Sequence, residues 1–151
     1  MPSILPSYLY TFIALLAVSS LLVFSFMAYV SAVRSASEIE LLKNLMDRVA
    51  AKGTELVTLA LTTDAKAESF MQMPTTIGSM QYWLQLRSTS ERCWVEGGFG
   101  DTVTEGTDLR VYLPEETVAS GIYVAGHGAA YLSCNFSAET PQLQLSNLSE
   151  R

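Results

Sequence analysis

The feature that most constrains this chain is its uncharged beginning: from Tyr8 to Val33 no side chain carries a charge. As an α-helix, this stretch would be roughly 39 Å long, which exceeds the ~30 Å hydrocarbon core of a bilayer. Its serines and its threonine can bond to the helix's own backbone, and Tyr8 and Tyr29 near its ends suit the membrane interface. The stretch therefore predicts a helix that spans a membrane or packs among other apolar helices.

Two other interpretations of the stretch stay open. A cleaved signal peptide has an apolar core of about 7–15 residues after a basic beginning. This core is longer, and residues 1–6 contain no Lys or Arg, although "SAVRSA" (31–36) offers small residues to a peptidase. A buried core helix of a soluble protein would rarely be this long without a charge. An uncleaved helix fits these observations better than either alternative.

Residues 34–60 predict that the helix continues past the uncharged stretch as an amphipathic stalk. Apolar side chains recur there at spacings of three, four and seven residues, as one stripe of a helix does. They are Leu42, Leu45, Val49 and Leu56. Gly53 interrupts this pattern and costs about 1 kcal/mol relative to Ala in a helix interior. We expect one helix that ends near Ala60 and whose stripe needs a partner to cover it.

Residues 61–151 change from a period of about 3.6 to a period of 2, the alternation typical of β-strands. Gly, Pro, Asp and Ser separate seven short segments of this kind. The segments are 67–73, 79–87, 92–100, 108–114, 121–126, 129–136 and 142–146. We expect an α+β fold in which the long N-terminal helix is followed by a small antiparallel β-sandwich.

The sequence thus predicts three regions. These are an apolar membrane or filament-core helix (1–33), its amphipathic continuation as a stalk (34–60), and a β-domain (61–151). Local turn residues add three predictions within the β-domain. They are a hairpin-like connection at 74–79, one helical turn at 114–120 and an edge strand at 142–146.

Cysteines and glycosylation sequons favour an extracytoplasmic position for the β-domain. Cys93 and Cys134 are the two cysteines of the chain, and each falls in a predicted strand. A disulfide between them would stabilise the fold by roughly 4 kcal/mol in the chain-entropy model. The sequons "NFS" and "NLS" begin at Asn135 and Asn147, which predicts two sites of N-glycosylation. Together with an N-terminal anchor, these features predict a location at the cell surface.

Charge and motif content exclude several classes of function. The net charge of −6 arises from residues 61–151, and no basic patch is present that would bind nucleic acid. His127, the only histidine, lies between two glycines and is expected to be a turn residue. Trp83 and Trp94 are expected to pack in the core or across strands. We therefore expect no enzyme, no cofactor, no metal site and no small-molecule substrate.

The whole layout resembles the type IV pilin-like proteins, especially the archaeal kind that includes archaellum filament and stator subunits. The residues that carry the resemblance are "YLYTFIALLAVSSLLVFSFMAYVSAV", the stalk "ELLKNLMDRVAAKGTELVTLAL" and the strand-rich remainder. "MPSILPS" lacks the family's basic and small residues before the apolar run, and no acid occurs before Glu38.

The resemblance implies a structural subunit that starts in the membrane and then assembles with copies of itself. It places the assembly contacts on Tyr8, Phe12, Leu16, Leu22, Phe26 and Tyr29. The alternative function is a single-pass anchor that presents the β-domain as an adhesion or stator-like binding module. Processing of the N-terminus would distinguish the two, since an assembling subunit is expected to begin within residues 5–8.

Overall fold

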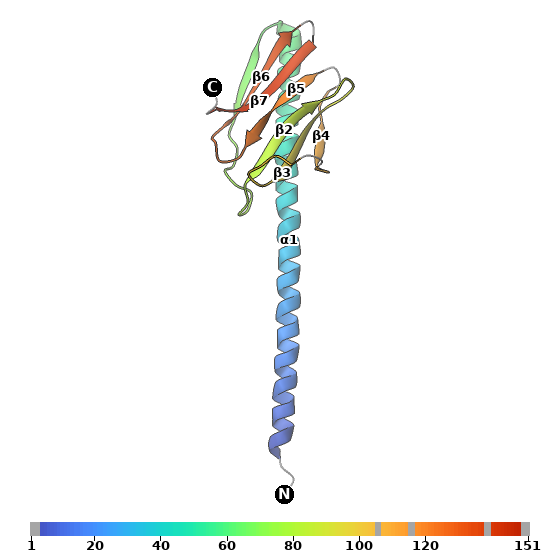
Figure 1. Ribbon diagram of the computed structural model, residues 1–151, viewed down its shortest axis with the longest axis vertical. Helices are drawn as coiled ribbons and strands as arrows, with labels where there is room; N and C mark the ends of the chain where they lie inside the picture. The colour runs from blue at the N-terminus through green and yellow to red at the C-terminus, as the bar shows by residue number, and fades with distance from the viewer. Residues whose placement is uncertain (1–3, 105–106, 115–116, 138–139, 149–151) are drawn as a thin grey trace. The chain divides into compact units, whose positions relative to one another are not determined.

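One helix contains both the uncharged stretch and the stalk: α1 runs from Ile4 to Thr63 (Figure 1). The structure is a computed structural model that describes residues 4–104, 107–114, 117–137 and 140–148. α1 ends three residues beyond the predicted Ala60. Asp64 follows with a positive φ of 51°, and its N–H donates to the carbonyl of Ala60 at 2.9 Å. Asp64 therefore takes the left-handed position that glycine often fills after a helix.

The chain divides into two units, residues 1–37 and residues 38–151, and the second is called the head below. All seven predicted strands are present in the head. They are β1 (Ala67–Met71), β2 (Tyr82–Ser88), β3 (Cys93–Phe99), β4 (Arg110–Tyr112), β5 (Val118–Val124), β6 (Ala130–Ser137) and β7 (Thr140–Asn147). Their order in the sheet is β1-β6-β7-β5-β2-β3-β4, and every neighbouring pair is antiparallel except β5 and β7, which are parallel.

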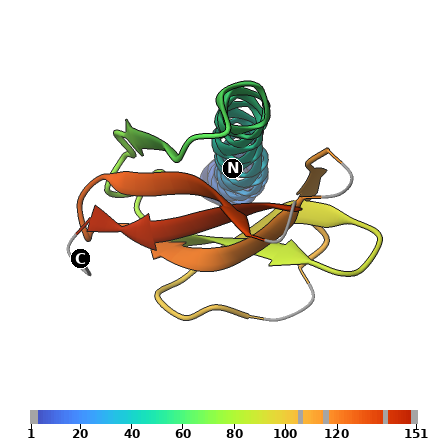
Figure 2. The same cartoon turned by 90° about the horizontal axis from the view of Figure 1, so that it is seen from above.

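The α+β fold is confirmed, but the strands form one open sheet and not a sandwich. Viewed from above, the second half of α1 lies across one face of this sheet (Figure 2). The helix thus takes the place that a second sheet would have in a sandwich. The described part of the β3–β4 connection passes over part of the opposite face (Figure 2).

Two local predictions are wrong because they assumed that neighbours in sequence are neighbours in the sheet, and a third is wrong where it overlaps a strand. β1 pairs with β6 and not with β2, so residues 74–79 do not close a hairpin between them. β7 lies between β6 and β5, so the predicted edge strand is internal and the edges are β1 and β4. The predicted helical turn at 114–120 overlaps β5, which begins at Val118; residues 115–116 lie outside the described residues.

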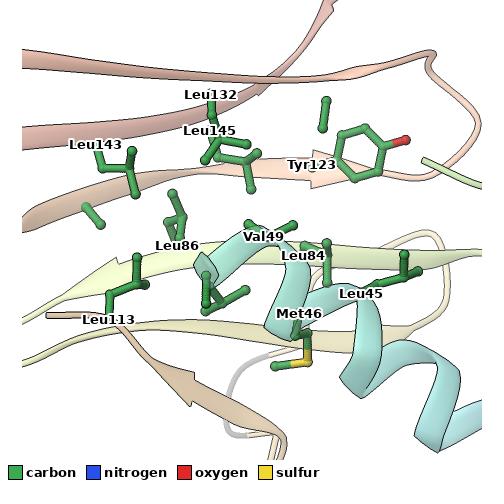
Figure 3. Close-up of a cluster of buried hydrophobic side chains, with 14 of the residues drawn as sticks. Leu45, Met46, Val49, Leu84, Leu86, Leu113, Tyr123, Leu132, Leu143 and Leu145 are labelled. Carbon is green, nitrogen blue, oxygen red and sulfur yellow. The ribbon is translucent and has the colours of Figure 1, made fainter. Parts of the chain in front are cut away.

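The predicted stripe of α1 supplies one side of the core. All four of its members are buried, with Leu42 and Val49 fully so. Figure 3 shows Leu45, Met46 and Val49 of α1 facing leucines of the sheet. The sheet residues labelled there are Leu84, Leu86, Leu132, Leu143, Leu145 and Tyr123, with Leu113 beside them. The stripe therefore finds its partner within the head.

Gly53, predicted to weaken the helix, marks a close approach of α1 to the leucines that cover it. A Cβ atom at this position would lie 2.8 Å from Leu143 Cδ2 and 3.0 Å from Leu113 Cδ2. The sheet contributes a second small residue, because a Cβ at Gly97 would lie 3.2 Å from Met46 Sδ. Glycine at position 53 lowers the helix propensity of α1, but it lets the helix pack more closely.

Candidate functional site

The residues predicted to mediate assembly all lie exposed on the first half of α1. Each of the six is at least 53% exposed in the structure. They are Tyr8, Phe12, Leu16, Leu22, Phe26 and Tyr29. The stretch from Tyr8 to Val33 is called the apolar segment below. Exposed apolar surface on this scale is typical of a site that contacts lipid or another protein.

Two serines of α1, one within the apolar segment and one just after it, bond to the helix itself. Ser20 Oγ donates to the carbonyl of Leu16 at 2.7 Å, and Ser35 Oγ donates to the carbonyl of Ser31 at 3.1 Å. Such bonds satisfy the hydroxyl groups without water. By length and composition the apolar segment could cross a membrane, a property that some core helices and signal sequences share.

The first acidic residue of the chain lies where the head begins. Glu38 is only 8% exposed, and its carboxylate packs against Gly78. Gly78 has a φ of +63° and sits in a tight turn in which Ile77 and Met80 exchange backbone hydrogen bonds of 3.0 and 3.1 Å. The turn leaves no room for a side chain at position 78. The connection between β1 and β2 therefore folds over the first turn of α1 within the head.

The predicted disulfide is wrong for this structure. Cys93 and Cys134 are free, buried thiols on β3 and β6. Three strands separate β3 from β6 in the sheet, which places them about 19 Å apart at ~4.8 Å per strand. A disulfide needs Cα atoms within about 7 Å. Burial raises the pKa of the Cys93 thiol to about 11 and also raises the pKa of Cys134, so both thiols are poor nucleophiles.

The two sequons differ in their surroundings. Asn135 is exposed on β6, so glycosylation there stays a prediction. Asn147 is only 5% exposed, and its Oδ1 accepts a hydrogen bond of 3.3 Å from the N–H of Val124. An oligosaccharide attached to the Nδ2 atom of this buried amide would not fit inside the fold. The burial of Asn147 therefore argues against a glycan there in the folded head.

A buried charge network that the sequence patterns did not predict lies on the face of the sheet away from α1. Glu96 is 1% exposed; Arg87 Nε lies 3.0 Å from its Oε1 and Arg110 Nε lies 3.9 Å from its Oε2. Trp94 Nε1 donates to Glu96 Oε2 at 3.2 Å, and Arg110 also lies 5.5 Å from the centre of the Trp94 ring. The glutamate in the otherwise uncharged strand "CWVEGGF" was the sequence signal that could have indicated this network. The network joins β2, β3 and β4, and its pairing offsets the cost of burying Glu96.

Both tryptophans pack as predicted. Trp83 is fully buried on β2, and Gly98 opposite it makes room for the ring, since a Cβ there would lie 2.7 Å from Trp83 Cζ2. Trp94 contacts Tyr112 on β4 with ring centres 6.5 Å apart. Each tryptophan ring therefore packs against a residue of the neighbouring strand, and the two tryptophans do not form an open aromatic platform.

Further chemistry is limited among the described residues. No group of three or more His, Cys, Asp or Glu side chains gathers there in a way that could hold a metal ion. His127 is exposed in a turn between Gly126 and Gly128, whose φ angles are +91° and +94°.

Comparisons with models of protein families, with curated proteins and with solved structures found no match. Any family relationship of this chain is therefore a proposal.

Proposed function

We propose that the protein is a structural subunit of a cell-surface, type IV pilin-like filament and that it assembles through its apolar N-terminal helix. The observation that carries this proposal is the division of one continuous helix, α1, into two kinds of surface. The apolar segment is exposed and uncharged, whereas residues from Leu42 onward are built into the core of the head.

The exposed apolar segment needs a cover that the chain itself does not supply in the described residues. Lipid would supply this cover before assembly, and copies of the same helix would supply it in a filament. Small residues along the segment would allow helix backbones to approach closely. They are Ala14, Ala17, Ser19, Ser20, Ser25 and Ala28. The proposed partners are therefore the membrane first and then copies of this chain.

The proposal places residues 61–151 outside the cell, where they would form the surface of the filament. The acidic net charge of this region suits a solvated outer layer. The free cysteines neither support nor oppose this location, because buried thiols with raised pKa values resist oxidation in either compartment. No nucleic acid and no small-molecule substrate is part of the proposed role.

The second candidate is a single-pass anchor that presents the head as an adhesion or stator-like binding module. The length and composition of the apolar segment favour it equally, because they also suit a lone span. In that role the segment stays in lipid and the small residues have no special partner.

Shearing experiments distinguish the two functions. Material sheared from cells that express the protein would be examined by electron microscopy, and the intact chain in that fraction would be measured by mass spectrometry. The proposal expects thin filaments that contain the chain. If shearing releases no filaments and the chain leaves the membrane only in detergent, the chain is an anchor and the proposal is wrong.

A further inference from the structure

We infer that the face of the sheet away from α1 carries a binding groove for a neutral carbohydrate, between β5 and β7. This inference concerns the head alone and does not depend on filament assembly. It begins from a break in the only parallel pair of the described sheet.

β5 and β7 pair for four residues and then separate. The pairing runs from Val118 with Gln142 to Gly121 with Leu145. Gly121 has a φ of +120°, and a Cβ there would collide with the backbone carbonyl of Leu145. Beyond this point the side chain of Asn147, and not the backbone of β7, accepts the N–H of Val124. The separation is therefore built from a glycine whose position leaves no room for a side chain and from an asparagine that supplies the acceptor.

A groove of about 480 Å³ opens where the strands separate, within the usual size range of small-ligand sites. Side chains of Gln85, Gln144 and Ser146 line it together with those of Ile122 and Val124. These five residues alternate with the core residues of their strands, so they belong to the face of the sheet away from α1. The groove thus opens on the face away from α1, and the core residue Leu145 also contributes to its lining.

The lining residues specify an uncharged ligand rich in hydroxyl groups. None of the described residues that line the groove carries a charge, so it offers no partner for an anionic or cationic group. Amide and hydroxyl side chains both donate and accept hydrogen bonds, as sugar hydroxyls do. Gln85 Oε1 is screened from water and has no hydrogen-bond partner, so its amide is one hydrogen bond short. Rotation of the part-buried Gln85 side chain would turn this oxygen into the groove, where a ligand hydroxyl would supply that bond.

A peptide fits these observations less well than a sugar. Extended peptides usually add to the free edge of a sheet, and the edges of this sheet are β1 and β4. The groove lies between internal strands, and Asn147 already occupies the backbone donor of Val124. A peptide is therefore an outcome that the test must be able to detect.

The test uses the full chain in lipid nanodiscs, because glycoside detergents could themselves occupy the groove. Saturation-transfer difference NMR would measure binding of three neutral probes: cellobiose, mannobiose and N,N′-diacetylchitobiose. Tri-galacturonic acid and tetra-alanine are the charged and peptide comparisons. The matched variants are Gln144→Ala, inside the groove, and Gln142→Ala, two residues earlier on the same strand and face but outside it. Both glutamines are exposed, so both variants should fold, which thermal unfolding would verify.

The expected result is binding of at least one neutral disaccharide, with affinity reduced roughly tenfold by Gln144→Ala and less than about twofold by Gln142→Ala. Three results would overturn the inference. One is no transfer to any neutral probe, which means that the groove holds only water. Another is equal loss in the two variants. The third is stronger binding of tri-galacturonic acid or tetra-alanine than of every neutral disaccharide.

Discussion

The two halves of α1 are both rich in leucine, yet they differ in what covers those leucines. In the apolar segment Leu16 and Leu22 are 53% and 66% exposed, whereas Leu42 in the second half is fully buried. The difference follows from the charges, since the first half has none, whereas the second half has several, most of them exposed and Glu38 buried. A helix that is apolar all round needs an apolar environment on every side, and a striped helix needs only one covered face. One helix can therefore carry an assembly surface and a folding surface.

The largest expected effect comes from placing charge in the apolar segment. The double variant Leu16→Arg/Leu22→Arg should lose retention in the membrane fraction and should form no filaments, because each Arg costs about 2.5–3.5 kcal/mol at the centre of a spanning helix. Sucrose-gradient fractionation and electron microscopy would measure both effects. The control is Leu16→Phe/Leu22→Phe, which should behave as the native chain. Normal membrane retention of the arginine variant would contradict the claim that the first half of α1 needs an apolar environment.

Truncating a leucine in the second half should act on the stability of the head. Leu42→Ala should lower the free energy of unfolding by about 2–5 kcal/mol, because it leaves a cavity under a fully buried side chain. The adjacent Leu41 is 50% exposed, and Leu41→Ala should change that free energy by less than about 0.5 kcal/mol. Urea unfolding followed by tryptophan fluorescence would compare the pair. Similar losses in the two variants would mean that the stripe does not define the core.

Gly53 tests how closely the second half must approach the sheet. Gly53→Leu should lower the free energy of unfolding by about 1–3 kcal/mol, because its side chain would meet Leu143 and Leu113. Ala51 is exposed on the same helix, so Ala51→Leu is the matched control and should have almost no effect. The same unfolding assay applies. A more stable Gly53→Leu variant would show that the close packing at this point is absent.

The smallest expected effect is a loss of head stability at alkaline pH. The thiol of an unfolded cysteine has a pKa of about 9.0, but burial holds the pKa of Cys93 at about 11. Between these values the unfolded chain binds fewer protons than the folded chain, so the free energy of unfolding falls as pH rises. For Cys93 the loss should be about 1 kcal/mol at pH 10, and Cys93→Ala should remove it. Unfolding midpoints that stay constant from pH 8 to pH 10 in the native chain would contradict this expectation.

Local patterns predicted the elements of this fold, whereas pairings between distant segments were beyond them. The stripe of α1 and the seven strands follow from periodicity, which is encoded in nearby residues. The partners of β1 and β7 depend on contacts across the whole head, which periodicity does not contain. The disulfide prediction failed for the same reason, because Cys93 and Cys134 were placed correctly in strands but not in a correct sheet order. Asn147 shows a further limit, since a sequon motif carries no information about burial.

The proposed filament depends above all on contacts between copies of the apolar segment, and oxidative cross-linking detects such contacts directly. The buried, unreactive native thiols give a low background for cysteines introduced by Phe12→Cys and Phe26→Cys together. Sheared, detergent-free filaments of this double variant would be oxidised and separated without reductant, beside the native chain as a control. We expect disulfide-linked dimers and larger multimers in the variant alone. Monomers only, with both new cysteines labelled by a lipid-soluble maleimide, would show that the segment faces lipid and would contradict the proposed assembly.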